Sequence, residues 1–168
     1  FYQRLAFDEI FSTFLVNSEI RKKIKKIKKN KKIFNSKKQI EIISKLDFIL
    51  TNDQKKTLNE INKDLCSDKK MFRLLQGDVG SGKTIVSLIS SFNTINSGFQ
   101  VAVMAPTEIL ARQHFLLAKK IFPKEICIEL LSGKSTYKDK KNISEKLRNK
   151  KIDIIFGTHA LFQKKIEF

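Results

Sequence analysis

The segment Gly77–Thr84 restricts the fold of this chain more than any other feature of its sequence. It reads Gly-Asp-Val-Gly-Ser-Gly-Lys-Thr and fits the pattern G-x-x-x-x-G-K-[ST], between an apolar run and an amphipathic stretch. In that pattern the glycines let backbone N–H groups curl around phosphate oxygens, and the following helix directs its positive N-terminus at them. The segment therefore predicts a nucleotide triphosphate site formed by Gly77, Asp78, Val79, Gly80, Ser81, Gly82, Lys83 and Thr84.

Two side chains of this segment carry the expected chemistry. Lys83 supplies a positive charge to the β- and γ-phosphates of ATP, and the Thr84 hydroxyl is a ligand for the Mg²⁺ that bridges them. The pattern by itself does not separate kinases, GTPases and motor enzymes. The chain has no N-K-x-D sequence of a GTPase, and its few Arg residues do not cluster as they would in the lid of a nucleotide kinase.

From Met71 onward, short apolar runs alternate with amphipathic stretches. The runs are Met71–Gln76, Gln100–Ala105, Ile126–Leu131 and Ile152–Phe156, and the stretches cover about 83–97, 107–120 and 138–149. Strands that alternate with helices predict an α/β fold of the P-loop NTPase (RecA-like) class, with a parallel sheet and helices on both faces. Ligands of such sheets bind at the carboxyl ends of the strands.

The N-terminal third of the chain is basic and helical in pattern. Residues 5–33 predict one long helix, residues 36–50 a connector, and a second helix begins near Thr51–Asp53. Nine of the twelve residues 21–32 are Lys or Arg, which is typical of a solvated helix face or, alternatively, of a track along a DNA backbone. The net charge of +17 has two explanations as well, nucleic-acid binding or the codon usage of an AT-rich genome.

Several other classes of protein are disfavoured. No apolar run of 18 residues exists, so a membrane span is not expected. Cys66 and Cys127 lie far apart, as do His114 and His159, which argues against a zinc site or a disulfide framework. The first residue is not Met, which suggests a fragment or a processed N-terminus.

Four sequence blocks resemble the first RecA-like lobe of the RecG family of bacterial ATP-dependent DNA helicases, within helicase superfamily 2. The P-loop block 74–84 matches almost letter for letter, and the other blocks are 48–54, 104–114 and 157–163. Residues 4–9 are similar to the helix that leads into the motor in that family. The resemblance implies a lead-in helix and basic connector at 1–47, followed at 48–168 by the N-terminal part of the ATP-binding domain, incomplete and ending before the Asp-Glu motif.

The resemblance also implies roles for individual residues. Phe48 and Gln54 are similar to the segment that senses adenine ahead of the P-loop. Residues that correspond to DNA-contacting motifs are Pro106, Thr107, Arg112, Gln113, Gly157, Thr158 and His159. From the residues alone, a plain turn after a strand is the favoured interpretation of Pro106-Thr107, and Gly157-Thr158 has the same ambiguity.

The function implied by the resemblance is that of an ATP-driven motor that acts on branched DNA, such as stalled forks and Holliday junctions. The parent protein is expected to be monomeric and to work in the bacterial cytoplasm with ATP and Mg²⁺. This chain alone is expected to bind nucleotide weakly and to hydrolyse almost none. The alternatives are a standalone basic nucleic-acid-binding module that uses nucleotide as a switch, and a small nucleotide kinase.

Overall fold

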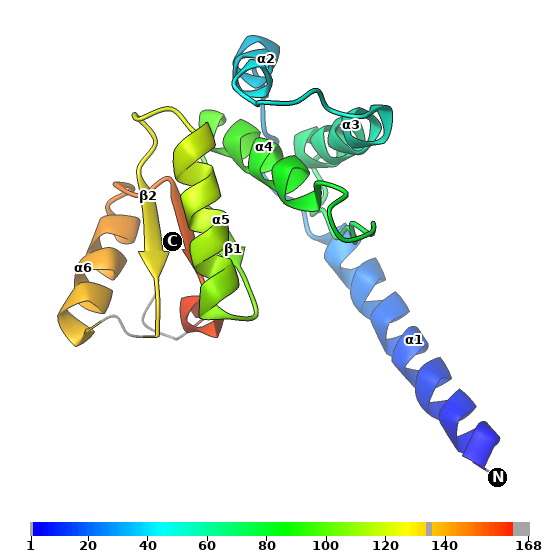
Figure 1. The fold of residues 1–168 in the computed structure, drawn as a ribbon. Coiled ribbons are helices and arrows are strands. Elements are labelled where there is room, and N and C mark those ends of the chain that lie inside the picture. The colour runs from blue at the N-terminus through cyan, green and yellow to red at the C-terminus, as the bar shows by residue number, and fades with distance from the viewer. Residues whose placement is uncertain (1, 134–135, 163–168) are drawn as a thin grey trace.

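The computed structural model describes residues 2–133 and 136–162 of the 168-residue chain. A strand–helix alternation follows an N-terminal group of helices (Figure 1). The elements in chain order are α1 (Tyr2–Lys26), α2 (Ser36–Ser44), α3 (Asn52–Cys66), α4 (Lys83–Asn96), β1 (Val101–Met104), α5 (Glu108–Ile121), β2 (Ile128–Leu131), α6 (Tyr137–Arg148), β3 (Ile154–Gly157) and the 3-10 helix η1 (His159–Phe162). This order confirms the α/β class that the sequence predicts, with a boundary shift of a residue or two at most elements.

The three strands form one parallel sheet in the order β1–β3–β2. Its central strand, β3, pairs with both neighbours, so that Ile154 lies opposite Val101 on one side and opposite Ile128 on the other. Successive side chains of a strand point to opposite faces. Ile154 and Phe156 pack in one core with α5, while Ile155 packs in a second core with α6. The helices α5 and α6 therefore cover opposite faces, as the sequence pattern predicts.

The central strand is apolar throughout because neither of its faces meets water. Ile154, Ile155 and Phe156 have no exposed surface, and Gly157 at the end of the strand is also buried. The ring of Phe156 meets that of Phe115 on α5 edge to face, with centroids 6.3 Å apart. This packing fixes the position of the loop that follows β3.

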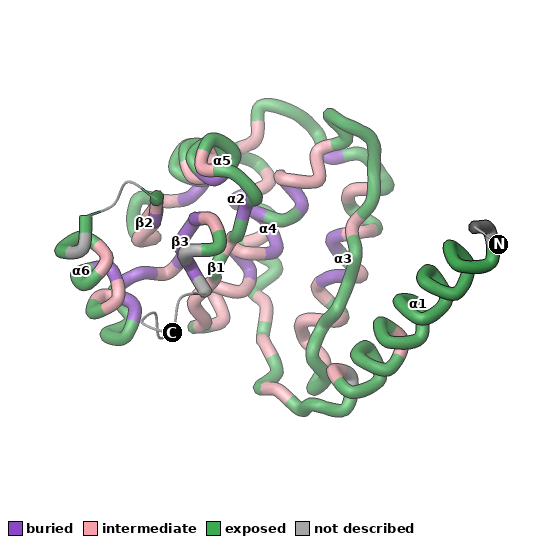
Figure 2. Tube along the Cα trace, turned by 90° about the horizontal axis from the view of Figure 1, so that it is seen from below, coloured by how far each residue is buried: buried purple, intermediate pink, exposed green. Residues whose placement is uncertain are grey.

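The helices α2, α3 and α4 pack together and share a core with the sheet (Figure 2). Ile42, Leu58 and Phe92, one from each helix, are nearly or fully buried in it. A buried amide group also joins the three helices: Asn93 Nδ2 donates to Gln39 Oε1 at 2.8 Å and to Asn62 Oδ1 at 3.1 Å. The sequence predicts a connector where α2 lies; Asn35 begins this short helix by accepting hydrogen bonds from Lys37 N and Lys38 N.

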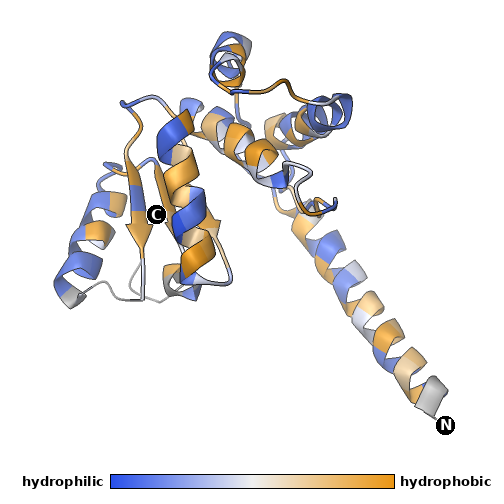
Figure 3. Cartoon of the chain, in the orientation of Figure 1, coloured by the Kyte–Doolittle hydropathy of each residue, from blue (hydrophilic) through white to orange (hydrophobic). Residues whose placement is uncertain are grey.

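The long helix α1 extends away from the rest of the molecule, with exposed residues along its length (Figure 2). Apolar and hydrophilic residues alternate in bands along it (Figure 3). The prediction that this helix reaches residue 33 is wrong, because it ends at Lys26. Like charges three or four residues apart weaken a helix, and residues 27–35 instead run as a connector whose backbone bonds to the chain near Lys69.

The segment Met71–Gln76 is not a strand, which corrects a second prediction. It has no partner in the sheet formed by the described residues, and Met71, Phe72 and Leu74 are exposed. A strand exists only through hydrogen bonds to a neighbour, and here β1 has β3 as its one partner within residues 2–133 and 136–162. The apolar run thus forms extended chain that leads directly into the glycine-rich loop.

Candidate functional site

The glycine-rich loop lies at the N-terminus of α4, as predicted. Gly80 and Gly82 have φ angles of 83° and 79°, a region that residues with a Cβ rarely adopt. Gly82 is the N-cap of α4, and no side chain caps this helix end. The first N–H groups of a helix have no partner within the helix and carry partial positive charge. The loop therefore directs free donors and a helix dipole toward one point, which suits an anion.

Lys83 lies across this loop. Its Nζ donates hydrogen bonds to the carbonyl oxygens of Gly77 at 2.7 Å and Asp78 at 2.6 Å. A Cβ on Gly77 would stand 2.7 Å from Ser81 Oγ, so the two ends of the loop lie close together. The ammonium group is thus held among backbone oxygens of the glycine-rich loop. Thr84, the next residue, lies in the first turn of α4 and is half-buried.

Gln54 joins the loop to α3. Its Nε2 donates to the carbonyl oxygen of Ser81 at 2.9 Å, and its Oε1 accepts from Thr51 N at 2.9 Å in a capping box that begins α3. Both ends of this amide are thus engaged by backbone groups. Phe48 does not share this arrangement: its half-exposed ring lines an open pocket with residues 43–44, 46–47 and 49–50 and with Lys55. Of the two residues implied as adenine sensors, only Gln54 contacts the glycine-rich loop.

The residues implied in DNA contact gather at the carboxyl edge of the sheet. Thr107 caps α5 by accepting a hydrogen bond from Leu110 N, and Pro106 before it is exposed. Ala105 N donates to Gly157 O at 2.9 Å, so the loops after β1 and β3 lie side by side. Two further implied residues, Arg112 and Gln113, are exposed on α5, and Thr158 and His159 lie after β3 with His159 exposed.

Gly157 has a structural reason to be glycine. A Cβ there would stand 2.8 Å from the carbonyl oxygen of Leu131 and 3.0 Å from Leu161 Cγ. The same edge also holds Gly133, whose neighbour across the turn is the Glu108 carboxylate, 3.6 Å from where a Cβ would lie. The sequence indicates that Gly133 follows a strand, but it does not predict that Gly133 lies close to Glu108.

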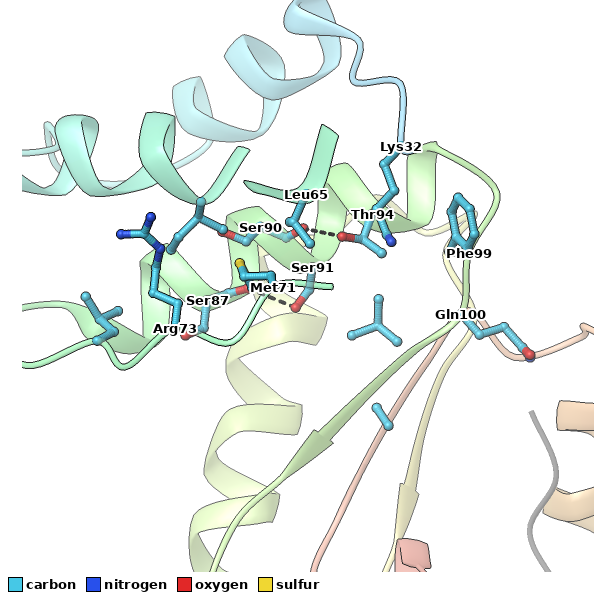
Figure 4. A pocket seen from close by; sticks show the side chains of 14 residues that line it. Lys32, Leu65, Met71, Arg73, Ser87, Ser90, Ser91, Thr94, Phe99 and Gln100 are labelled. Atoms are coloured by element: carbon cyan, nitrogen blue, oxygen red, sulfur yellow. Dashed lines mark hydrogen bonds between the residues drawn. The ribbon is translucent and has the colours of Figure 1, made fainter. Parts of the chain in front are cut away.

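A separate open groove of about 460 Å³ lies between residues 71–75, α4 and β1. Figure 4 shows that Arg73 and Ser87 line one end and Phe99 and Gln100 the other. Hydroxyl groups on this side of α4 donate to carbonyls one turn back, for example Ser91 Oγ to Ser87 O at 2.8 Å. None of the residues of the glycine-rich loop lines the groove, so it is distinct from the candidate phosphate site.

Residues 51–167 match the DEAD/DEAH box helicase family, and this range includes the glycine-rich loop and the carboxyl edge of the sheet. The chain belongs to the DEAD/DEAH box helicase family. Its fold is therefore that of a helicase motor lobe. Within the described residues, no helix is long and apolar enough to cross a membrane, and no cluster of three or more His, Cys, Asp or Glu could hold a metal ion.

Curated relatives within this family carry the name ATP-dependent DNA helicase RecG. The protein of Thermotoga maritima is 44% identical over 99% of this chain and 21% of its own length. The protein of Aquifex aeolicus is 41% identical over 100% of this chain and 21% of its own. The chain therefore spans about a fifth of the length of these relatives.

Two solved structures are similar to this helicase chain. A RecG protein bound to a three-way DNA junction matches with a TM-score of 0.86 and 43% identity, over 99% of this chain and 23% of the other. The UvsW helicase of bacteriophage T4 matches with a TM-score of 0.51 and 17% identity, over 79% and 46%, which is a likeness of fold alone. The resemblance to RecG helicases that the sequence blocks indicate is confirmed by these comparisons.

Proposed function

We propose that this chain is the ATP-binding part of a DNA helicase or translocase that remodels branched DNA, such as stalled forks and Holliday junctions, in recombination and repair. The observation that carries the proposal is the glycine-rich loop closed around Lys83 at an uncapped helix end. Support for the DNA substrate comes from relatives named as DNA helicases and from the junction-bound RecG structure.

The loop residues fit the triphosphate of ATP. Backbone N–H groups of Gly80–Thr84 and the dipole of α4 would hold the phosphate oxygens, with Lys83 as the charged partner. In binding, the Lys83 ammonium exchanges the carbonyl oxygens of Gly77 and Asp78 for phosphate oxygens. The Thr84 hydroxyl would hold Mg²⁺, which supplies charge neutralisation between the β- and γ-phosphates when bound.

Recognition of the adenine base would fall to Gln54, with Phe48 as a further candidate. Because both ends of the Gln54 amide already bond to backbone groups, reading a base requires the exchange of one of these bonds. The bond to Ser81 O is the natural one to exchange, since it lies on the phosphate loop itself. Base recognition and loop position are then coupled through a single side chain.

DNA contact would involve the loops at the carboxyl edge of the sheet. Pro106 and Thr107 present the N-terminus of α5, and a helix N-terminus with a hydroxyl is suited to holding one backbone phosphate. Thr158 and His159 follow β3 beside them, with Arg112 and Gln113 one turn into α5. Such contacts position a strand and carry no base preference.

The same proposal covers organisation and location. Residues 1–47 form the lead-in helix and basic connector, and residues 48–168 are the N-terminal part of the ATP-binding domain. The protein works as a monomer in the bacterial cytoplasm, where the DNA substrate lies. The expectation that this chain alone hydrolyses almost no ATP stays a prediction.

The test is nucleotide binding by the wild-type chain and by Lys83→Ala, measured by isothermal titration with a non-hydrolysable ATP analogue and Mg²⁺. We expect Lys83→Ala to weaken binding at least about tenfold, since hydrogen bonds to charged groups are worth roughly 1.5–3 kcal/mol. Lys124→Ala serves as the matched control, because Lys124 carries the same charge but is exposed after α5, outside the glycine-rich loop. Equal affinity of Lys83→Ala and Lys124→Ala would remove the basis of the proposal.

A second measurement examines the metal ligand. Thr84→Ala is expected to keep metal-free nucleotide binding and to lose the gain in affinity that Mg²⁺ gives the wild-type chain. An undiminished Mg²⁺ effect in Thr84→Ala would show that the ion is held elsewhere. ATP turnover measured on the same samples checks the expectation of minimal hydrolysis.

A further inference from the structure

The basic segment 21–38 stands apart from the loops described above. Eleven of its eighteen residues are Lys or Arg, and it contains no Asp or Glu. A third of the chain's 34 basic residues thus lie in about a ninth of its length. A general codon bias would spread lysines along the chain in proportion to length, so it does not account for this concentration.

The segment is attached to the motor lobe by hydrogen bonds of its backbone groups. Lys29 N donates to Asp68 O at 2.8 Å, and Lys70 N donates to Ile27 O at 3.4 Å. Further along, Ser97 Oγ at the end of α4 donates to Ile33 O at 2.8 Å. These bonds attach the connector to the ends of α3 and α4, so its charges keep a defined position on the lobe.

Three of the lysines serve this attachment. Lys29 Nζ donates to the carbonyl oxygens of Asp64 and Leu65, the last turn of α3, where a cation is favoured by the helix dipole. Partial burial, followed by the charge of Lys32, lowers the pKa of Lys29. Lys32 Nζ lies 4.4 Å from the centroid of the Phe99 ring, and Lys38 Nζ donates to Asn96 Oδ1 at 2.9 Å.

A second group of lysines has no such role. Their side chains are exposed and, within the described part of the chain, make no ion pair or hydrogen bond; these are Lys23, Lys26, Lys28, Lys31 and Lys37. The carboxylates at the end of α3 are already engaged, because Arg73 pairs with both Glu60 and Asp64 at 2.7 Å. In segment 21–38 the one ion pair of the described residues joins Lys22 to Glu19. These five lysines, here called the ridge, carry positive charge that no ion pair among the described residues offsets.

We infer that this ridge, Lys23, Lys26, Lys28, Lys31 and Lys37, is a docking surface for the sugar–phosphate backbone of duplex DNA, separate from the carboxyl edge of the sheet. Lysine is a point charge on a flexible stem, suited to phosphates and not to the bidentate reading of bases. Segment 21–38 has ten Lys and one Arg, so the contact is independent of sequence. The inference rests on the proposed DNA-remodelling function, for which it adds a second, purely electrostatic contact.

The chain that carries the ridge is long enough to reach along about one turn of a DNA duplex. The last turns of α1 supply Lys23 and Lys26 one helical turn apart, on one face. The connector 27–35 adds at most about 30 Å of extended chain. This upper limit is comparable to one turn of B-DNA, which is roughly 34 Å long. A path of this length allows several phosphates to be met in succession.

The test is the salt dependence of binding to a fluorescein-labelled 30-base-pair duplex of arbitrary sequence, measured by anisotropy between 50 and 200 mM NaCl without nucleotide. The ridge variant carries the five substitutions Lys23→Gln, Lys26→Gln, Lys28→Gln, Lys31→Gln and Lys37→Gln. The control variant changes five exposed lysines elsewhere: Lys56→Gln, Lys124→Gln, Lys138→Gln, Lys141→Gln and Lys151→Gln. Both variants lose the same net charge, so a difference between them reports position and not charge alone.

Each phosphate neutralised on duplex DNA contributes about 0.9 to the slope of log K against log salt. We expect the ridge variant to lose about 3–4 from that slope and the control variant less than about 1. Five Lys→Arg substitutions on the ridge should restore the slope, which excludes misfolding as the cause. Equal slopes in the ridge and control variants would overturn the inference.

Two further measurements distinguish the inference from its alternatives. The ridge variant should bind the ATP analogue like the wild-type chain, so a loss of binding in this variant alone would report misfolding, whereas a wild-type chain that does not bind the analogue would contradict the proposed function. Vesicles of phosphatidylserine and phosphatidylcholine test for an anionic membrane instead. Ridge-dependent vesicle binding together with an unchanged DNA slope would refute DNA as the partner.

Discussion

Alanine at Gly82 should destabilise the chain more than alanine at Gly80, and Gln54 is the reason. Both glycines have positive φ angles, 79° and 83°. Alanine in this region costs about 1–2 kcal/mol at either position. The surroundings differ, because a Cβ on Gly82 would stand 2.4 Å from Gln54 Nε2, whereas a Cβ on Gly80 would meet nothing within 4 Å.

The difference between the two variants can be derived from one hydrogen bond. The Gln54 amide is the end of a flexible side chain and can move away from the new methyl group. In doing so it loses its bond to Ser81 O, now 2.9 Å long. A hydrogen bond of this kind contributes about 0.5–1.5 kcal/mol. We therefore expect Gly82→Ala to lower the unfolding free energy by that amount more than Gly80→Ala does. This excess should vanish in a Gln54→Ala background.

The assay is urea unfolding followed by circular dichroism, with free energies from linear extrapolation. Wild type, the three single variants and the two double variants with Gln54→Ala complete two double-mutant cycles, in which the loss of the α3 cap cancels. If Gly82→Ala and Gly80→Ala cost the same in the wild-type background, Gln54 does not rest against the loop. An excess that persists without the Gln54 side chain would assign it to backbone strain instead.

Three shorter predictions concern the lobe that carries the site. Lys150 has φ 53° directly after α6, so Lys150→Gly should raise the urea midpoint, with a gain of about 0.5–1 kcal/mol. Phe156→Ala should lower the unfolding free energy by about 3–5 kcal/mol in the same assay, since its ring is fully buried. Burial, then the charges of Glu129 and Asp153, raise the pKa of the Cys127 thiol. Iodoacetamide should therefore react at pH 8 more slowly with Cys127 than with the thiol of glutathione. Because the folded chain keeps that proton longer, the unfolding free energy should fall as pH rises above the usual 9.0.

The sequence predicts the part of the fold whose signals are local. The glycine-rich loop, the alternation of β1, β2 and β3 with helices, and the cap at Thr51 follow from short patterns, and the structure has them within a residue or two. The pairing order β1–β3–β2 was not predictable in this way. Strand pairing depends on contacts between residues far apart in sequence. The hydrophobic periodicity of a single segment carries no information about these contacts.

The predictions that the structure corrects failed for the same physical reason. An apolar run such as Met71–Gln76 indicates extended chain but not a partner, and here it stands outside the sheet. Helical spacing from residue 5 to 33 gave no sign that Lys29 would leave the helix to bond the end of α3. For the candidate site, the motif identifies Lys83 and its loop, whereas the contact of Gln54 with Ser81 could come only from three-dimensional structure.

The helix α3 is tied at both of its ends. At its first turn Gln54 bonds the phosphate loop through Ser81, and at its last turn the carbonyls of Asp64 and Leu65 hold Lys29 of the basic connector. Its fifteen residues make a rod about 22 Å long. A helix of this length is stiff, so that a displacement of one end also moves the other end. The glycine-rich loop and the charged segment that follows α1 are therefore attached to opposite ends of a single helix.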